Sequence, residues 1–173
     1  MGDVGTAVFA TAIGDCGIAW NDSGVCGVQL PEASTEDTKA RLARYWPGLG
    51  EVEPSPTATR AIEGITALLS GEPDPMNDVV VDLAGVSEFR RGVYEIARTV
   101  GPGDTITYGE IAARLGTPHA AREVGQALGA NPVPLIVPCH RVLAAGGKLG
   151  GFSARGGVTT KSRLLAIEGA SLF

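Results

Sequence analysis

The sequence predicts an α+β fold, with a small antiparallel sheet and helices first and a mainly helical region after it. Residues 6–30 contain short β-rich segments separated by turn residues, whereas later segments show helical periodicity preceded by capping residues. Hydrophobic residues make up 44% of the chain and charged residues 19%, which is typical of globular proteins. A length of 173 residues allows one domain or two small ones.

The first half of the chain has the pattern of a scaffold. Three strands are expected at residues 6–13, 17–20 and 24–30. Ser34 should cap a helix that runs to Tyr45, and a second helix should begin at Thr57 or Thr59. A further strand is expected at residues 79–83. No pattern of catalytic residues occurs here, so we expect a scaffold domain at residues 1–85, with the boundary near Ala84–Ser87.

The second half, residues 86–173, has the pattern of a separate helical domain. Ser87 should cap a helix over residues 88–100. Thr107-Tyr-Gly-Glu110 is a capping box that opens a short helix to Leu115. Gly116 should end that helix, and Thr117 should cap the next one, residues 119–128.

Two short helices joined by a tight turn with a glycine predict a helix-turn-helix motif. On the second helix, Arg122 and Gln126 share a face that is flanked by small residues, Ala121, Gly125 and Gly129. Such a face can pack closely against the protein core, or it can press onto DNA. A last helix should start at Thr159 or Thr160 and end at Glu168.

Charge is distributed unevenly along the chain. The net charge is −5, yet residues 1–85 carry 4 Lys and Arg against 13 Asp and Glu, whereas residues 86–173 carry 10 against 6. The second half can therefore approach phosphate, with moderate and salt-sensitive affinity. The sequence shows neither a long apolar run nor a signal-peptide pattern, so we expect a cytoplasmic chain without a membrane partner.

The three cysteines predict free thiols in a reducing compartment. Cys16 and Cys26 flank a turn and could face each other across strands, but two reduced core residues are favoured over a disulfide. A zinc site needs about four ligands. The only histidines are His119 and His140, so no metal and no other cofactor is expected.

The most informative stretch is Asn131-Pro-Val-Pro-Leu-Ile-Val-Pro-Cys-His-Arg-Val142. Its apolar run, Leu135–Val137, predicts a buried strand or an extended core segment between two prolines. A lone cysteine in such a run is usually a buried hydrophobe. Here His140 follows Cys139 directly and an arginine comes next, which favours a thiolate nucleophile.

This stretch resembles the active-site signature of the O6-alkylguanine-DNA alkyltransferases, and the similarity extends from about Phe89 to Glu168. The resemblance implies a ribonuclease H-like first domain and a winged-helix-like second domain. It also implies that Cys139 accepts an alkyl group from guanine O6 in one irreversible step. Glu168 would hold His140, which would reach the thiol through a water molecule.

The resemblance further implies a monomeric protein that binds double-stranded DNA carrying O6-alkylguanine in the minor groove. Asn131 would brace the turn into the active site, and Arg122 would fill the place of a flipped nucleotide. Tyr108 would crowd the 3′ phosphate and bond the extruded base. Other residues match DNA-contacting positions: Ala121, Gly125, Thr117 and Arg90. The pocket wall would comprise Tyr108, Val142, Phe152 and Ser153.

One segment departs from the family pattern. Residues 154–160 are about two residues longer than the family pattern, which adds Arg155 as a candidate phosphate contact.

A lesion-binding protein that transfers no alkyl group is the main alternative function, although such proteins replace the cysteine. A cysteine hydrolase is disfavoured because an adjacent histidine cannot easily face the thiol.

Overall fold

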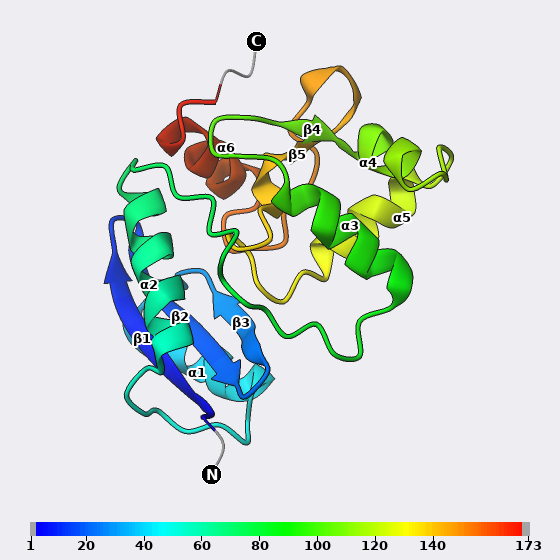
Figure 1. Cartoon of the computed structure of the whole chain (residues 1–173). Helices are drawn as coiled ribbons and strands as arrows, with labels where there is room; N and C mark the ends of the chain where they lie inside the picture. Colours follow the sequence, from blue (N-terminus) through cyan, green and yellow to red (C-terminus); the bar gives the residue numbers. More distant parts are fainter. Residues whose placement is uncertain (1–2, 171–173) are drawn as a thin grey trace. The chain divides into compact units, whose positions relative to one another are not determined.

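The computed structural model describes residues 3–170, which form a mixed α/β fold with one small antiparallel sheet and six α-helices. The residues divide into two compact units (Figure 1). The first holds the chain up to Leu83 together with Pro132–Ile136, and the second holds Ala84–Asn131 and the chain from Val137 onward. No helix in the described part of the chain is long and apolar enough to cross a bilayer.

The sheet of the first unit is a three-stranded meander in the order β1-β2-β3. Its strands are β1 (Gly5–Thr11), β2 (Gly14–Asn21) and β3 (Gly24–Gln29). The expected strands are therefore confirmed. Gly24 has φ +135°, a conformation that favours glycine at the β2–β3 turn. Ile18 and Trp20 are fully buried, so β2 supplies the centre of this core.

Two capped helices contact the sheet. Helix α1 (Thr35–Tyr45) begins at the expected cap, Ser34. Helix α2 (Pro56–Leu69) begins before either expected threonine, because Ser55 accepts a hydrogen bond from Ala58 N–H and Pro56 takes the first helical position. The prediction of a strand at residues 79–83 is wrong. Only a single parallel bridge, Val25 to Val81, forms there.

The second unit is built around three helices that contact one another. They are α3 (Glu88–Arg98), α4 (Tyr108–Arg114) and α5 (Ala121–Gly129). The expected caps Ser87 and Thr107 both accept backbone hydrogen bonds, from Arg90 and Glu110. Tyr94 of α3 is buried, and its hydroxyl donates to the Ala127 carbonyl at 2.6 Å, which ties α3 to the end of α5.

The turn between α4 and α5 follows only part of the prediction. Gly116 has φ +77° and ends α4 as expected, because Thr117 N–H bonds back to the Ala112 carbonyl in a Schellman arrangement. Thr117 does not cap α5. It opens a turn, with Ala120 N–H bonded to its carbonyl, and α5 starts after Ala120 without a side-chain cap.

The segment before Cys139 is part of the core, as expected, but it forms neither a strand nor a continuously extended run. Leu135 has φ +74°, a left-handed conformation that breaks an extended run, and the flanking prolines remove backbone donors. The residues are nevertheless buried. Cys139 opens a short 3₁₀ turn, η1 (Cys139–Arg141).

Strand pairing places the segment after Cys139 beside the start of α4. Strand β5 (Val142–Leu143) pairs in parallel with β4 (Ile106–Thr107). A second 3₁₀ turn, η2 (Ala145–Gly147), follows, and the chain ends in α6 (Val158–Ile167). Helix α6 begins after Gly157, not at the expected threonines. Because β4 leads directly into Tyr108, the pairing holds this tyrosine near the active-site segment.

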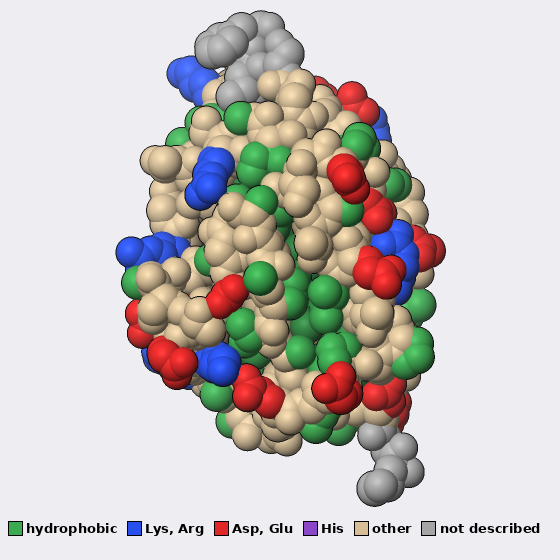
Figure 2. Space-filling view, turned by 90° about the vertical axis from the view of Figure 1, so that its left-hand side faces the viewer, with side chains coloured by type: hydrophobic (Ala, Val, Ile, Leu, Met, Phe, Trp, Pro, Cys, Tyr) green, Lys and Arg blue, Asp and Glu red, His purple; other side chains and the backbone are tan. Residues whose placement is uncertain are grey.

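Surface charge is mixed on the face drawn in Figure 2, where acidic and basic side chains alternate with neutral surface. In the first unit, Arg60 forms hydrogen-bonded ion pairs with Asp74 and Asp78. The exposed basic side chains of the second unit include Arg90 and Arg122.

Candidate functional site

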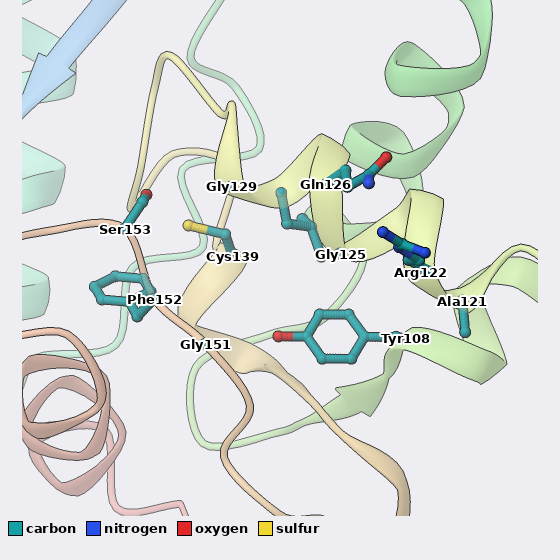
Figure 3. A pocket seen from close by; sticks show the side chains of 11 residues that line it. Tyr108, Ala121, Arg122, Gly125, Gln126, Gly129, Cys139, Gly151, Phe152 and Ser153 are labelled. Carbon is teal, nitrogen blue, oxygen red and sulfur yellow. The ribbon is translucent and has the colours of Figure 1, made fainter.

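A cavity of about 520 Å³ lies wholly within the second unit, and Cys139 forms part of its wall. Figure 3 shows the thiol between α5 and the segment that carries Phe152 and Ser153. The residues that line the cavity are Tyr108, Ala121, Arg122, Gly125, Gln126, Leu128, Gly129, Cys139, Gly151, Phe152 and Ser153. Small and apolar residues make up much of the wall, and polar groups of Tyr108, Arg122, Gln126 and Ser153 lie among them, which is typical of small-molecule sites.

Local backbone bonds hold Cys139 in place. Its N–H donates to the Val137 carbonyl at 2.8 Å, and Arg141 N–H donates to the Pro138 carbonyl at 2.9 Å. The Asn131 side chain donates to the same Val137 carbonyl at 2.8 Å. Asn131 comes directly after Ala130, the C-cap of α5, so this amide connects the end of that helix to the segment that leads into Cys139.

Cys139 is buried, with 7% of the residue exposed. Burial raises the pKa of Cys139, while a hydrogen bond from Asn131 and the charge of Lys161 act to lower it. The resting thiol is therefore protonated at neutral pH, and it needs a base before it can act as a nucleophile. Burial also raises the pKa of Cys16, to about 12; a hydrogen bond with Thr11 acts to lower it, but the neighbouring charge is the anion Asp15, which raises it further.

A base lies next to Cys139 in a buried cluster with two other side chains. His140 Nε2 lies 2.9 Å from Glu168 Oε2. Arg141 donates two hydrogen bonds to the same carboxylate, from Nε to Oε1 at 2.9 Å and from Nη2 to Oε2 at 2.7 Å. Its third bond, from Nη1 to the Val100 carbonyl, is 2.8 Å long. The three side chains are at most 2% exposed.

The charges in this cluster determine the protonation of His140. Burial acts to raise the pKa of Glu168, but the bonds from Arg141 and His140 outweigh it and lower the pKa to about 2. Burial and the Arg141 charge hold the pKa of His140 below its ordinary value. The imidazole is therefore neutral at neutral pH. Because the ionised carboxylate can only accept, the ring proton sits on Nε2.

The other ring nitrogen, His140 Nδ1, is consequently an acceptor. It is buried and has no hydrogen-bonding partner among the described residues. A buried acceptor of this kind normally requires a partner. Nδ1 can accept the proton of the neighbouring thiol, directly or through a water molecule.

A second buried cation lies on the other side of the cavity wall. Lys161 is fully buried on α6, and its ammonium donates to the Val142 carbonyl at 2.6 Å and to the Gly151 carbonyl at 3.3 Å. It also lies 3.4 Å from the Tyr108 hydroxyl. Burial lowers the pKa of Lys161 to about 8, while Cys139 acts in the opposite direction. The Lys161 ammonium therefore donates a hydrogen bond to the hydroxyl of Tyr108, whose side chain lines the cavity.

The structure brings most of the expected residues to one place. Tyr108, Ala121, Arg122, Gly125, Cys139, Phe152 and Ser153 line the cavity. Three others do not line it: His140 and Glu168 are hydrogen-bonded to each other, and Asn131 is hydrogen-bonded to the Val137 carbonyl. Val142 contributes its carbonyl to Lys161 but does not line the cavity. Thr117 and Arg90 are exposed elsewhere in the second unit, on the α4–α5 turn and in the first turn of α3.

Sequence reasoning missed two buried cations, Arg141 and Lys161. Arg141 stood inside the active-site stretch, but nothing local showed that it would pair with Glu168. Lys161 did carry a signal. It is three and four residues before Leu164 and Leu165, so it occupies the inward face of α6.

Comparison with known proteins agrees with this geometry. The profile of the family described as 6-O-methylguanine DNA methyltransferase, DNA binding domain, matches residues 88–170. A methylated-DNA–protein-cysteine methyltransferase of Methanothermobacter thermautotrophicus is 34% identical over 158 residues, covering 91% of this chain and 81% of the relative. The chain belongs to the methylated-DNA–protein-cysteine methyltransferase family.

Other methylated-DNA–protein-cysteine methyltransferases match over most of the chain. The Mycobacterium tuberculosis family member is 42% identical over 125 residues, covering 72% of this chain and 73% of the relative. A crystal structure described as Mycobacterium tuberculosis OGT in complex with DNA is similar, with a TM-score of 0.74 and 33% identity. That alignment covers 96% of this chain and 93% of the other. The similarity therefore includes both units, not only the helical one.

Proposed function

We propose that this protein repairs DNA by direct reversal, moving the alkyl group of an O6-alkylguanine to Cys139. The observation that carries the proposal is the Cys139 thiol in the wall of a cavity, with the buried His140 and Glu168 pair beside it. A bond forms between Sγ and the alkyl carbon, and the bond from that carbon to guanine O6 breaks. The electron pair stays on O6. The thioether is stable, so each protein molecule acts once.

Activation of the thiol follows from the protonation states of the cluster. His140 Nδ1 takes the thiol proton, through a water molecule as in the family arrangement. Glu168 keeps the other ring proton on Nε2 and stabilises the imidazolium that forms. The charge of Lys161 and the Asn131 amide favour the thiolate. The guanine anion that leaves needs a proton, which the Tyr108 hydroxyl is positioned to give.

The substrate has to leave the DNA stack before it can meet the thiol, because a paired base keeps O6 inside the duplex. We infer that α5 enters the minor groove, where its small residues Ala121 and Gly125 permit close approach. Arg122, exposed on the same helix, would fill the place of the flipped nucleotide. Thr117, Arg90 and Arg155 would contact phosphates.

The wider setting is proposed on the same grounds. We infer a ribonuclease H-like first unit, supported by its three-stranded sheet and two helices, and a winged-helix-like second unit, supported by the helix pair beside β4 and β5. We further propose that the protein works as a monomer in the cytoplasm, where it meets DNA.

Intact mass spectrometry tests the function directly. The protein is mixed with duplex DNA that contains O6-methylguanine, and its mass should rise once, by the mass of one methylene group. Cys139→Ala should show no increase and should still bind the lesion duplex. Cys26→Ala, which removes a half-buried cysteine of the first unit, is the matched control and should gain the same mass as the wild type. A wild-type mass that stays unchanged with retained binding would instead indicate a lesion-binding protein.

A further inference from the structure

The cavity side of α5 presents two long polar side chains, and the proposed repair reaction uses one of them. Arg122 and Gln126 both line the cavity. The other lining residues of this helix are small or apolar: Ala121, Gly125, Leu128 and Gly129. Gln126 lies one helical turn after Arg122, and it therefore points from the same face.

The carboxamide of Gln126 is free to bind something outside the protein. The residue is exposed, and within residues 3–170 its side chain makes no hydrogen bond. Figure 3 shows its amide group pointing away from Cys139, whereas the Tyr108 hydroxyl lies toward the cavity interior. Gln126 is thus on the rim. It would contact what remains in the duplex and not the flipped base.

The chemistry of an amide suits the minor groove at one particular kind of base pair. Every base pair presents acceptors in that groove, and a G·C pair adds one donor, the guanine N2 amino group. Arg122 can only donate hydrogen bonds, whereas a glutamine amide both donates and accepts. Gln126 is therefore able to accept from guanine N2 and to donate to a neighbouring acceptor.

The spacing along the helix indicates which base pair is in reach. One turn of α-helix advances by about 5.4 Å, and neighbouring phosphates along a DNA strand are about 3.4 Å apart along the axis. If Arg122 occupies the vacated place and α5 follows the groove, a residue one turn away is displaced by between one and two base-pair steps, which leaves the adjacent base pair within reach of the long Gln126 side chain.

We propose that Gln126 is a specificity-determining residue, which hydrogen-bonds the minor-groove edge of the base pair next to the flipped nucleotide and favours a pair that contains guanine. The inference rests on the proposed function, because it requires α5 to lie in the minor groove. Gln126 would add a preference for particular bases beside the lesion, which the alkyl transfer at Cys139 does not itself require.

The test compares second-order rate constants for methyl transfer from duplexes that differ in one neighbouring pair. The neighbour is G·C or inosine·C, on either side of the lesion, because inosine lacks only the N2 amino group. The wild type should react about fivefold to tenfold faster with G·C on one side, the effect of one hydrogen bond. In Gln126→Met, which keeps the length but offers only a weakly accepting sulfur and no donor, this ratio should fall below about twofold.

A ratio within one protein preparation is independent of the fraction of active protein, so partial misfolding cannot imitate the result. Glu123→Gln, an exposed change on α5 outside the cavity lining, should keep the wild-type ratio. Equal ratios in the wild type and Gln126→Met would overturn the inference. So would a Gln126→Met effect that depends only on the base opposite the lesion. Failure of the proposed function itself would look different, since the wild type would then transfer no methyl group from any duplex.

Discussion

Replacing Glu168 with glutamine should destabilise the second unit strongly, because this carboxylate balances the charge of the buried Arg141. The pKa of Glu168 falls from 4.5 to about 2 in the folded protein. A difference of about 2.5 pKa units corresponds to roughly 3 kcal/mol of stabilisation of the ionised form. Removing one partner of a buried ion pair generally destabilises a protein by about 3–5 kcal/mol. We therefore expect Glu168→Gln to lose about 3 kcal/mol of unfolding free energy at pH 7.

The pH dependence of this loss has a definite sign. Because the folded pKa of Glu168 lies below the unfolded value, its contribution is complete above about pH 4.5 and is lost as the pH falls toward 2. The stability difference between the wild type and Glu168→Gln should therefore shrink over this range. Below this pH range, Arg141 has no anionic partner in either protein, because the wild type has a protonated Glu168 carboxyl there and the variant has a neutral amide.

Chemical denaturation followed by far-ultraviolet circular dichroism measures the effect. Tryptophan fluorescence is unsuitable, because both tryptophans, Trp20 and Trp46, lie in the first unit. The matched control is Glu95→Gln, an exposed change on α3, which should alter stability by less than about 0.5 kcal/mol. A Glu168→Gln protein as stable as the wild type at pH 7 would refute the role assigned to the ion pair.

Three further substitutions have distinct expected outcomes. Arg122→Ala should slow transfer from duplex DNA roughly tenfold to hundredfold more than transfer from free O6-benzylguanine, because only duplex substrates need a flipped nucleotide; equal losses would contradict this. Lys161 has a folded pKa of about 8, below its unfolded value of 10.5. Between these values only the folded state has lost the proton, so wild-type stability should rise with pH relative to Lys161→Met, by up to about 3 kcal/mol; parallel pH curves would exclude the lowered pKa. Tyr94→Phe leaves the buried Ala127 carbonyl without its hydroxyl donor and should reduce the unfolding free energy by about 1 kcal/mol, whereas unchanged denaturation curves would show that this bond adds no net stability.

Local signals in the sequence predicted the helices well, because each depends on a few neighbouring residues. Ser34, Ser87 and Thr107 cap helices where expected, and Gly116 ends α4. Thr117 failed as a cap because its backbone is used in a turn before α5. A threonine before a proline satisfies both patterns, and the sequence alone does not distinguish them.

The errors near the active site have a different origin, because they concern contacts between distant segments. The left-handed Leu135 interrupts a run that has the composition of a strand, and no local pattern predicts such a conformation in a leucine. Likewise, Pro132–Ile136 belongs with the first unit although its neighbours in the chain belong with the second. The boundary predicted at residues 85 and 86 remains a prediction; it treats each domain as one continuous segment, because no local pattern indicates that Pro132–Ile136 groups with the first unit.

Arg141 has a consequence for the conditions in which the protein can work. A histidine held only by a carboxylate would become cationic in mildly acid surroundings, and it could then no longer remove a proton. Burial, together with the charge of the Arg141 guanidinium, outweighs the carboxylate, and the pKa of His140 stays below its ordinary value. The imidazole therefore stays neutral, and able to accept the thiol proton, at a lower pH than an exposed histidine would.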